Sequence, residues 1–227
     1  DLKTIEHSFR YLNQEFFDSA QISRYENFVE YKNNELNLTN KFNELISNSI
    51  YKDLINESIN YGIVDYEKKF GIKNYGLPFF KLYENYNMLN IALLCNFEKI
   101  HSSFRGSGFL KHNNDFFLFI SIEKDKFSKA AKYQNDFLSK NKFTYISKPG
   151  MSQEKGDGFR LINNIEEKVN LHIFVRKFVQ VDKKTQKFIY LGLGDTTSYK
   201  ENKPIELEIT LRNTLSDDLY EEFTKIV

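Results

Sequence analysis

The amino-acid sequence predicts an α+β protein, in which an N-terminal helical region is followed by a β-rich region and a C-terminal helix. Two patterns predict this class. Apolar residues recur every three or four positions up to about residue 95, as they do on one face of a helix. After Phe97 the period shortens to two, as in strands with one buried face. We therefore expect two domains, residues 1–97 and residues 98–227.

The helical region begins with IEHSFRYLNQEFF, whose apolar residues share one helix face. Ser23 is expected to cap a second, short helix, with Glu26 in the capping-box position. Thr39 is expected to cap a third helix, which continues through Ile55. The stretch LPFFKLYENY then predicts a helix with Pro78 near its first turn, and NMLNIALLC predicts a short buried helix.

In the β-rich region, SGFLK and DFFLFISI are predicted to form a hairpin joined by HNND. Strands are also predicted for FTYIS, LHIFVRK, KFIYLGL and PIELEITLR, while the charged run EKDKFSKAAKYQND is interpreted as a loop or short helix. The segment GLGD, from Gly192 to Asp195, is predicted to turn the backbone or to allow a close approach to it. Ser216 is predicted to cap the C-terminal helix DDLYEEF.

The net charge of +1 hides a strong asymmetry along the chain. Residues 101–190 hold 17 Lys and Arg against 9 Asp and Glu, a net charge of +8. Residues 1–100 and residues 191–227 carry net charges of −3 and −4. Positive charge concentrated on the strand-rich segment points to an acidic partner, with nucleic acid as the first choice.

The composition also bears on the compartment. The single cysteine, Cys95, lies in the apolar run IALLC and predicts a reducing compartment, which we take to be the cytoplasm. No apolar run is long enough to span a bilayer, and no signal peptide is visible. Because the chain begins at Asp1 without Met, we expect a fragment of a longer protein.

The sequence lacks the common motifs of catalysis. It holds no GxxxxGK[ST] phosphate loop, no HExxH and no CxxC, and its four histidines do not stand at metal-ligand spacings. His172, inside a predicted strand, is interpreted as a packed residue, and GLGD is too short for a dinucleotide fingerprint. We therefore expect a binding module without catalytic residues, metal or cofactor. The alternative is a nuclease whose site the sequence hides.

A basic, glycine-bearing loop between aromatic strands predicts where the binding surface lies. Lys148, Lys155 and Arg160 belong to this loop. Together with Arg176 they could contact the phosphates of a nucleic acid. The alternative is an ordinary solvated loop beside a β-barrel core.

Two tyrosines could stack on an exposed base, at roughly 1–3 kcal/mol each. Tyr145 shares a strand face with Phe143, and Tyr190 closes the run KFIY. The alternative is that these rings fill the core of a barrel, which is the interpretation we favour for Phe143.

An ordered series of motifs resembles a known family. The series is YGI at residues 61–63, FKLYENYNMLNIALLCNFEK, FFLFISI, KYQNDFLS, FTYIS, HIFVRK, FIYLG, KPIELEI and LYEEF. It is similar to the C-terminal domain of type IV, modification-dependent restriction enzymes of the SauUSI kind, where the domain follows a phospholipase-D-like nuclease and a superfamily-2 helicase. The similarity covers about residues 55–227, and residues 1–54 would connect the domain to the motor.

The resemblance implies a module that reads 5-methyl- or 5-hydroxymethylcytosine in double-stranded DNA for an ATP-dependent restriction endonuclease. It implies a fold similar to SRA domains, PUA-like mixed β-barrels that flip a modified base into an aromatic pocket. Tyr145, where the family usually carries Trp, would form one wall, and Ser147 would offer a hydroxyl to the base edge. Tyr190 would form the opposite wall, and Asp195 would accept a hydrogen bond from the cytosine amino group.

A second interpretation assigns the chain to protein interaction. In this case residues 1–95 would dock the helicase–nuclease modules of the same polypeptide or form a dimer. The apolar helix faces and negative net charge of the helical region favour this role for that region. An electrophoretic mobility-shift assay with methylated and unmethylated duplexes would separate the two interpretations.

Overall fold

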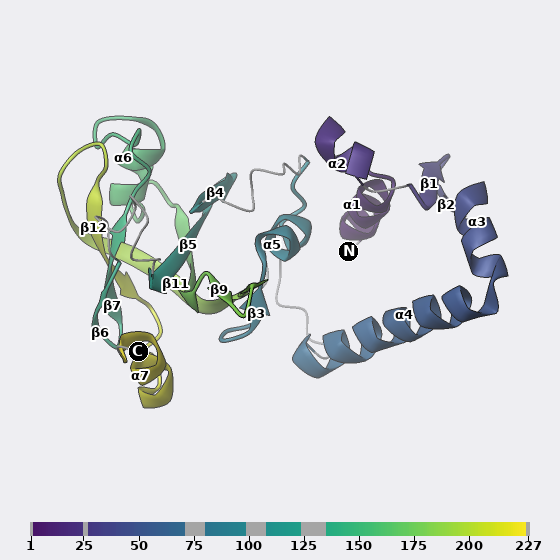
Figure 1. The fold of residues 1–227 in the computed structure, drawn as a ribbon. Helices are drawn as coiled ribbons and strands as arrows, with labels where there is room; N and C mark the ends of the chain where they lie inside the picture. Colours follow the sequence, from purple (N-terminus) through teal and green to yellow (C-terminus); the bar gives the residue numbers. More distant parts are fainter. Residues whose placement is uncertain (1, 25–26, 71–79, 99–107, 124–134, 226–227) are drawn as a thin grey trace. The chain divides into compact units, whose positions relative to one another are not determined.

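The computed structural model describes residues 2–24, 27–70, 80–98, 108–123 and 135–225. The chain forms two compact units. The N-terminal unit comprises Asp1–Lys81 with Met88–Arg105, and the sheet unit comprises Leu82–Asn87 with Gly106–Val227. Figure 1 shows the elements of both units, which we describe separately. None of the described helices has the length and apolar character needed to cross a membrane.

The N-terminal unit is mostly helical, as the apolar spacing predicts. Its elements are α1 (Leu2–Leu12), α2 (Ser19–Arg24), β1 (Val29–Lys32), β2 (Glu35–Leu38), α3 (Asn40–Ser47), α4 (Ser49–Phe70) and α5 (Met88–Leu94). The Thr39 cap is confirmed, since its side chain accepts a hydrogen bond from the backbone N–H of Phe42. The Ser23 cap is wrong, because Ser23 lies inside α2 and donates to the carbonyl of Ala20 at 3.0 Å.

The β1–β2 hairpin is a feature that the periodicity of the sequence did not reveal. Its turn consists of Asn33 and Asn34, with φ of 54° and 63°. Asn tolerates this left-handed region better than most residues, and two such residues in succession suit a tight hairpin. The pair of asparagines was therefore the available signal for this element.

The helix predicted for residues 77–86 is wrong where the chain is described, and Pro78 lies outside the described residues. Residues 82–83 form a turn, and β3 (Asn85–Tyr86) pairs with β11 (Phe188–Lys200). The backbone N–H of Tyr83 donates to the carbonyl of Tyr190 at 2.8 Å. Tertiary pairing with a long strand here overrides local helix propensity.

The sheet unit contains an eight-stranded mixed sheet and a C-terminal helix, α7 (Asp217–Thr224), which confirms the α+β class. The strand order is β4-β5-β8-β11-β12-β7-β6, with β3 paired to β11. Bounds are β4 (Phe109–His112), β5 (Asp115–Glu123), β6 (Phe137–Ser139), β7 (Lys142–Ile146), β8 (Asn170–Phe178) and β12 (Glu206–Leu211), with helix α6 (Gly156–Ile162) after β7. β5 and β8 are parallel, and the other neighbours are antiparallel.

The expected barrel is not closed by hydrogen bonds, because β4 and β6 stand at the two ends of the strand order. The predicted strands and the hairpin of β4 and β5 are confirmed. Ser216 caps α7 as predicted, by accepting from the backbone N–H of Leu219. The charged run at residues 124–134 lies outside the described residues.

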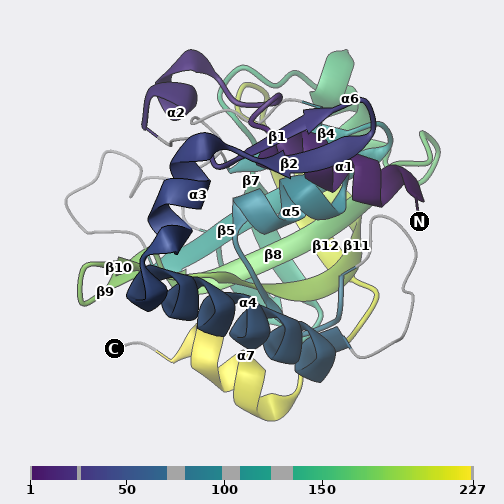
Figure 2. The same ribbon diagram turned by 90° about the vertical axis from the view of Figure 1, so that its right-hand side faces the viewer.

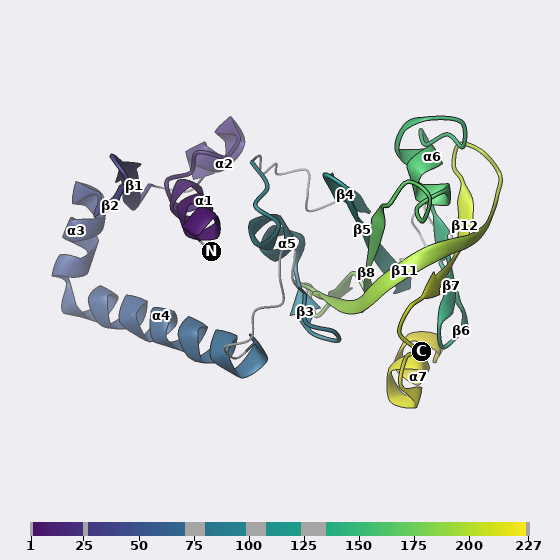
Figure 3. The ribbon, with the colours of Figure 1, turned by 180° about the vertical axis from the view of Figure 1, so that it is seen from behind.

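Strand β11 is bent and is the longest strand of the sheet (Figure 3). Its pairing with β8 is interrupted by a bulge between Tyr190 and Gly192, where Gly192 has φ of +94°. A Cβ on Gly192 would lie 2.5 Å from Asn213 Nδ2, and one on Gly194 would lie 2.7 Å from Ile209 Cγ2. GLGD therefore does not end the strand in a turn. Its glycines permit a bulge and close packing while the strand continues.

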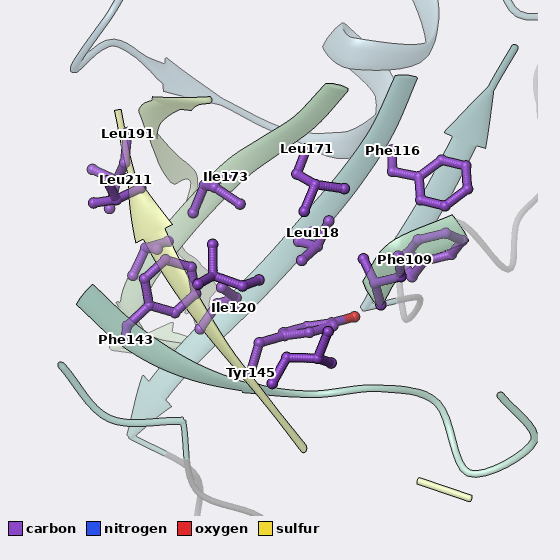
Figure 4. Packing of buried hydrophobic residues seen from close by; sticks show 14 of the residues in the cluster. Phe109, Phe116, Leu118, Ile120, Phe143, Tyr145, Leu171, Ile173, Leu191 and Leu211 are labelled. Atoms are coloured by element: carbon purple, nitrogen blue, oxygen red, sulfur yellow. The ribbon is translucent and has the colours of Figure 1, made fainter. Parts of the chain in front are cut away.

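The core lies on the inner face of this curved sheet (Figure 4). Leu118, Leu171 and Leu207, from three strands, are fully buried there. Leu161 of α6 and Phe223 of α7 belong to the same cluster. The alternation predicted for β12 is confirmed, since Leu207, Ile209 and Leu211 are buried and the residues between them are half-buried.

Replacing Gly192 with Ala tests the bend of β11. The added methyl group meets the Asn213 side chain at a φ that L-residues rarely adopt. We expect the free energy of unfolding in urea to fall by about 1–3 kcal/mol. Gly150→Ala is the control, because a Cβ at that position meets nothing within 4 Å. Equal stability of the two variants would contradict this explanation of the bend.

Candidate nucleic-acid interface

The loop that follows β7 leads into α6 and is held by close contacts. Gly158 packs against Ser152 so closely that a Cβ would lie 2.2 Å from the Ser152 carbonyl oxygen. Glu154 accepts hydrogen bonds from the Ser152 hydroxyl and, at 2.9 Å, from Asn202 Nδ2. These contacts fix the loop to the connection between β11 and β12. The backbone that carries the basic residues of the loop therefore has a defined position.

Lys148 links the end of β7 to β4, the strand at one end of the open sheet. Its Nζ donates to the carbonyl oxygen of Phe109 at 3.1 Å and lies 5.4 Å from the centre of the Phe109 ring. Burial lowers the pKa of Lys148, and the negative charge of Asp157 opposes that shift. The ammonium group thus holds the end of β7 against β4, and a phosphate contact by Lys148 stays a prediction.

Lys155 precedes α6 and Arg160 lies on it, at the end of the sheet where β5 and β8 begin. Lys155 is the exposed N-cap residue of this helix. Arg160 Nη2 donates to Asn114 Oδ1 at 2.8 Å, and its guanidinium lies 5.1 Å from the centre of the Phe116 ring. Lys155 is therefore the more accessible of the two cations. Arg160 is partly committed to internal contacts.

Tyr145 lies on the inner face of the sheet and is 4% exposed. Figure 4 shows its hydroxyl directed toward Phe109. Burial raises the pKa of the Tyr145 phenol. Ser147, also buried, accepts from the backbone N–H of Ile205 at 2.9 Å and donates to the carbonyl of Lys148 at 3.2 Å. Both residues therefore help to hold β7 and β12 together.

Tyr190 lies on the opposite face of the sheet from Tyr145. Its neighbour Leu191 belongs to the inner core, whereas the Tyr190 hydroxyl lies 3.0 Å from Nδ1 of His172. His172 Nε2 in turn lies 3.0 Å from Asp115 Oδ1. With a neutral imidazole, Nε2 donates to the carboxylate and Nδ1 accepts from the phenol. The structure thus does not bring Tyr145 and Tyr190 together as two walls of one pocket.

Asp115 anchors this polar chain at the start of β5. It also accepts a hydrogen bond from Asn170 Nδ2 at 2.9 Å. Burial raises its pKa, but the hydrogen bonds from His172 and Asn170 outweigh that effect, so the pKa lies below its usual value. His172 is accordingly a buried, hydrogen-bonded residue, as the sequence indicated.

Asp195 is engaged by Arg212 in a two-pronged ion pair. Arg212 Nε donates to Oδ2 at 2.8 Å, and Nη2 donates to Oδ1 at 2.7 Å. Asn164 Nδ2 adds a third hydrogen bond to Oδ1 at 3.0 Å, and these contacts hold the pKa of Asp195 below its usual value, Arg212 most of all. A cytosine amino group would have to compete with Arg212 for this carboxylate.

Asn164 is a buried residue that the sequence analysis did not single out. Its Nδ2 contacts Asp195 and the carbonyl of Val169, while its Oδ1 accepts from the backbone N–H of Thr196 at 2.9 Å. It therefore ties the segment after α6 to β11. The sequence NN after an apolar helix gave no specific signal of this role.

Arg176 lies near the other end of β8, away from the loop that contains Lys148. Its Nε donates to Ser121 Oγ at 2.9 Å, its Nη1 donates to the Gln186 carbonyl at 3.0 Å, and it lies over the Phe188 ring at 4.2 Å. Burial lowers its pKa. The four predicted phosphate contacts therefore do not form one continuous surface.

Sequence reasoning also missed a basic hairpin, formed by β9 (Gln180–Val181) and β10 (Lys184–Thr185). Lys183, Lys184 and Lys187 are exposed on or beside it. The signal was present as two adjacent lysines in a polar turn between short strand-like pairs. Within the described part of the chain, no three His, Cys, Asp or Glu side chains gather in a way that could hold a metal ion.

The Asp195–Arg212 pair predicts a pH-dependent contribution to stability. Because folding lowers the pKa of Asp195, its contribution is full above the ordinary value of 3.8 and is lost as the pH falls through the folded value. We expect Asp195→Asn to reduce the free energy of unfolding by about 1–2 kcal/mol at pH 7. The difference from the parent protein should shrink between about pH 4 and pH 2.

Urea titrations at several pH values measure this difference. Asp182→Asn, in the exposed turn of the basic hairpin, serves as the control and should have little effect at any pH. A deficit for Asp195→Asn that is the same at pH 7 and at pH 2 would show that packing, not charge, is responsible.

Comparisons with known proteins found similar solved structures and two matching families. Several solved structures are similar at low sequence identity. The SRA domain of SUVH5 in complex with hemimethylated CG DNA has a TM-score of 0.41 and 13% identity, over 63% of this chain and 97% of that chain. The DNA recognition domain of the cytosine modification-dependent restriction endonuclease LpnPI has a TM-score of 0.33 and 12% identity, over 48% and 62%. The DNA modification-dependent restriction endonuclease AspBHI has a TM-score of 0.29 and 9% identity, over 45% and 32%.

At the level of sequence, no curated protein matches the chain significantly. Residues 1–69 match the family described as domain of unknown function DUF8090. Residues 80–223, which contain all the strands of the large sheet, match the family described as domain of unknown function DUF3427. Since the second match covers more than half of the sequence, the chain belongs to the DUF3427 family.

Proposed function

We propose that the sheet unit binds double-stranded DNA and reads 5-methyl- or 5-hydroxymethylcytosine, as the recognition module of a larger restriction endonuclease. The observation that carries this proposal is the net charge of +8 on residues 101–190, in a chain whose total is only +1. Positive side chains replace counterions on the phosphate backbone, which supplies most of the affinity for DNA. Six of the eight acidic residues in 191–227 lie instead on β12 and α7.

The proposal includes base flipping, because a methyl group on cytosine offers only apolar contact. A dry aromatic pocket around an extruded base can detect that contact. Tyr145 is our candidate for the wall of this pocket, with Ser147 beside the base edge. Both lie on the inner face near β4, where the sheet is open and Lys148 spans the distance to Phe109. Entry of a base would displace Lys148 from the Phe109 carbonyl.

Tyr190 and Asp195 have a different place in the proposal. Arg212 donates a hydrogen bond to Asp195, and this bond is the main cause of the raised pKa of Arg212. Tyr190 also contributes to raising this pKa. Tyr190 lies on the opposite face of the sheet from Tyr145. Tyr190 and Asp195 can affect DNA recognition only as supports of the sheet or as a separate contact.

The proposed module does not cut DNA by itself. Helicase and nuclease modules of the same polypeptide would supply ATP-driven movement and cleavage, as in type IV restriction. Incubation of duplex DNA with the chain and Mg²⁺ should leave the DNA intact. Cleavage would identify the hidden nuclease that is the alternative.

A second function is favoured for the N-terminal unit by the surface of α4. This 22-residue helix exposes large apolar side chains on most of its length. They are Ile50, Tyr51, Leu54, Ile59, Tyr61, Ile63, Val64 and Tyr66. Exposed apolar area of this extent marks an interaction surface, and we propose that a second copy of the chain covers it.

A series of substitutions at Tyr145 tests the pocket. Tyr145→Phe retains the flat ring and should keep the preference for methylated duplex, whereas Tyr145→Leu retains an apolar side chain but removes the stacking surface. We expect Tyr145→Leu to reduce the preference by about tenfold, which equals about 1.4 kcal/mol. This preference is measured by fluorescence anisotropy with duplexes that contain plain cytosine, 5-methylcytosine or 5-hydroxymethylcytosine.

The matched control is Phe143→Leu, which changes a buried ring on the same face of the same strand. It should reduce stability without changing the preference for methylated DNA. An unchanged preference in a folded Tyr145→Leu protein places the pocket elsewhere. A parent protein without any preference overturns the proposed function itself.

Paired substitutions on α4 test self-association. Leu54→Glu with Ile59→Glu introduces two charges on exposed positions, so we expect little change in stability but loss of dimers. Sedimentation of the parent chain at increasing concentration should show a monomer–dimer equilibrium. A parent chain that stays monomeric at all concentrations rules out this function for α4.

A further inference from the structure

The basic hairpin extends past the end of β8 (Figure 2). Its turn residues Asp182 and Lys183 have φ of 49° and 63°, the geometry that favours a tight two-residue connection. Every residue from 179 to 185 is exposed. The hairpin therefore projects from the sheet as a two-stranded ribbon that contributes nothing to the core.

The charge of the hairpin is strongly one-sided. The hairpin and its flanking residues carry three cations, Lys183, Lys184 and Lys187, and a single acidic residue, Asp182. Among the described residues, none of these three ammonium groups has an ion-pair partner. Three exposed, unneutralised cations on a projecting ribbon repel one another, and an anionic partner would relieve that repulsion.

The base of the hairpin is firmly attached to the sheet. The backbone N–H of Gln186 donates to the carbonyl of Val179 at 3.0 Å, which closes the ribbon. Arg176 donates to the Gln186 carbonyl and to Ser121 of β5, and it lies over the ring of Phe188. A half-buried cation thus fixes the point from which the exposed cations project. A rigid base reduces the entropy lost when the ribbon binds a partner.

The two faces of the ribbon differ in chemistry. Val181 is directly opposite Lys184, so these two side chains share one face. Gln180 is opposite Thr185 on the other face. One face therefore offers apolar and cationic contacts, and the other offers an amide and a hydroxyl. This combination suits a DNA groove, where phosphates, sugars and base edges lie close together.

We propose that the β9–β10 hairpin enters the major groove of duplex DNA and holds the phosphates on its two sides through Lys183, Lys184 and Lys187. A two-stranded ribbon fits this groove, which is about 12 Å wide in B-form DNA. The inference rests on the proposed function in that the sheet unit binds DNA. It adds a second contact, at the end of the sheet opposite to α6 and Lys155.

The experiment compares the full chain with the triple variant Lys183→Ala, Lys184→Ala and Lys187→Ala. Affinity for plain and methylated B-form duplexes is measured by fluorescence anisotropy between 50 and 200 mM salt. We expect at least about a tenfold loss of affinity for both duplexes. The slope of log affinity against log salt should fall by about 2–3 units, since each lost phosphate contact removes about 0.9.

Two further variants serve as controls. Lys41→Ala, Lys52→Ala and Lys68→Ala remove the same charge from the N-terminal unit and should change the slope by less than about one unit. Lys→Arg at the three hairpin positions keeps the charge and should restore affinity and slope. Because the hairpin side chains are exposed, the melting temperature of each variant should match that of the parent.

The outcomes separate the hairpin from the reading of the modified base. If the hairpin acts as proposed, the ratio of affinities for methylated and plain duplex is unchanged in the alanine variant. Suppose that the parent protein shows no preference for methylated duplex, but the salt slope still falls in the alanine variant. This result would overturn the proposed reading of modified cytosine and would still support the hairpin contact. A slope equal to that of the charge-matched control would overturn the hairpin contact.

Double-stranded RNA distinguishes entry into a groove from general attraction. The major groove of A-form RNA is too deep and narrow for protein side chains to reach its floor. The alanine variant should therefore lose much less affinity for an RNA duplex than for a DNA duplex of the same length. An equal loss on both duplexes would overturn groove entry.

Discussion

The bend of β11 is the constraint on which the sheet unit depends. Its first part pairs with β8 and its second part pairs with β12, so a single strand joins the two halves of the sheet. Bulges and the close packing of Gly192 and Gly194 allow it to change direction without breaking either ladder. The inner core exists because the halves curve toward one another over the same apolar side chains.

Curvature without closure leaves two strand ends to be stabilised by other means. Lys148 holds the end of β7 against the backbone of β4. On β11, Asp195 binds Arg212, which follows β12, and Asn164, which follows α6. Arg176 performs a similar role at the far end of β8. Several charged groups are thereby committed to structure, whereas Lys155 and the hairpin lysines are among the cations that the described part of the sheet unit exposes to solvent.

This division suggests how affinity and specificity could be separated in one small unit. Contacts with phosphates position a protein on DNA but carry no sequence information, whereas recognition of a modified base requires a dry, shaped site. The exposed cations lie at both ends of the sheet, and the proposed base contact at Tyr145 lies on its inner face between them. A change at either end can therefore weaken binding without altering the base that is preferred.

Elements whose causes are local could be predicted from the amino-acid sequence. Period-two runs such as the one through Leu207 and Ile209 must bury one face, and Thr39 and Ser216 supply caps through neighbouring backbone groups. The pairing of residues 85–86 with β11 could not be predicted in this way, because a strand distant in the sequence supplies those hydrogen bonds. Lys148 and Lys155 look alike in the sequence, yet the ammonium group of Lys148 donates to a carbonyl 39 residues away, whereas Lys155 stands exposed as the N-cap residue of α6.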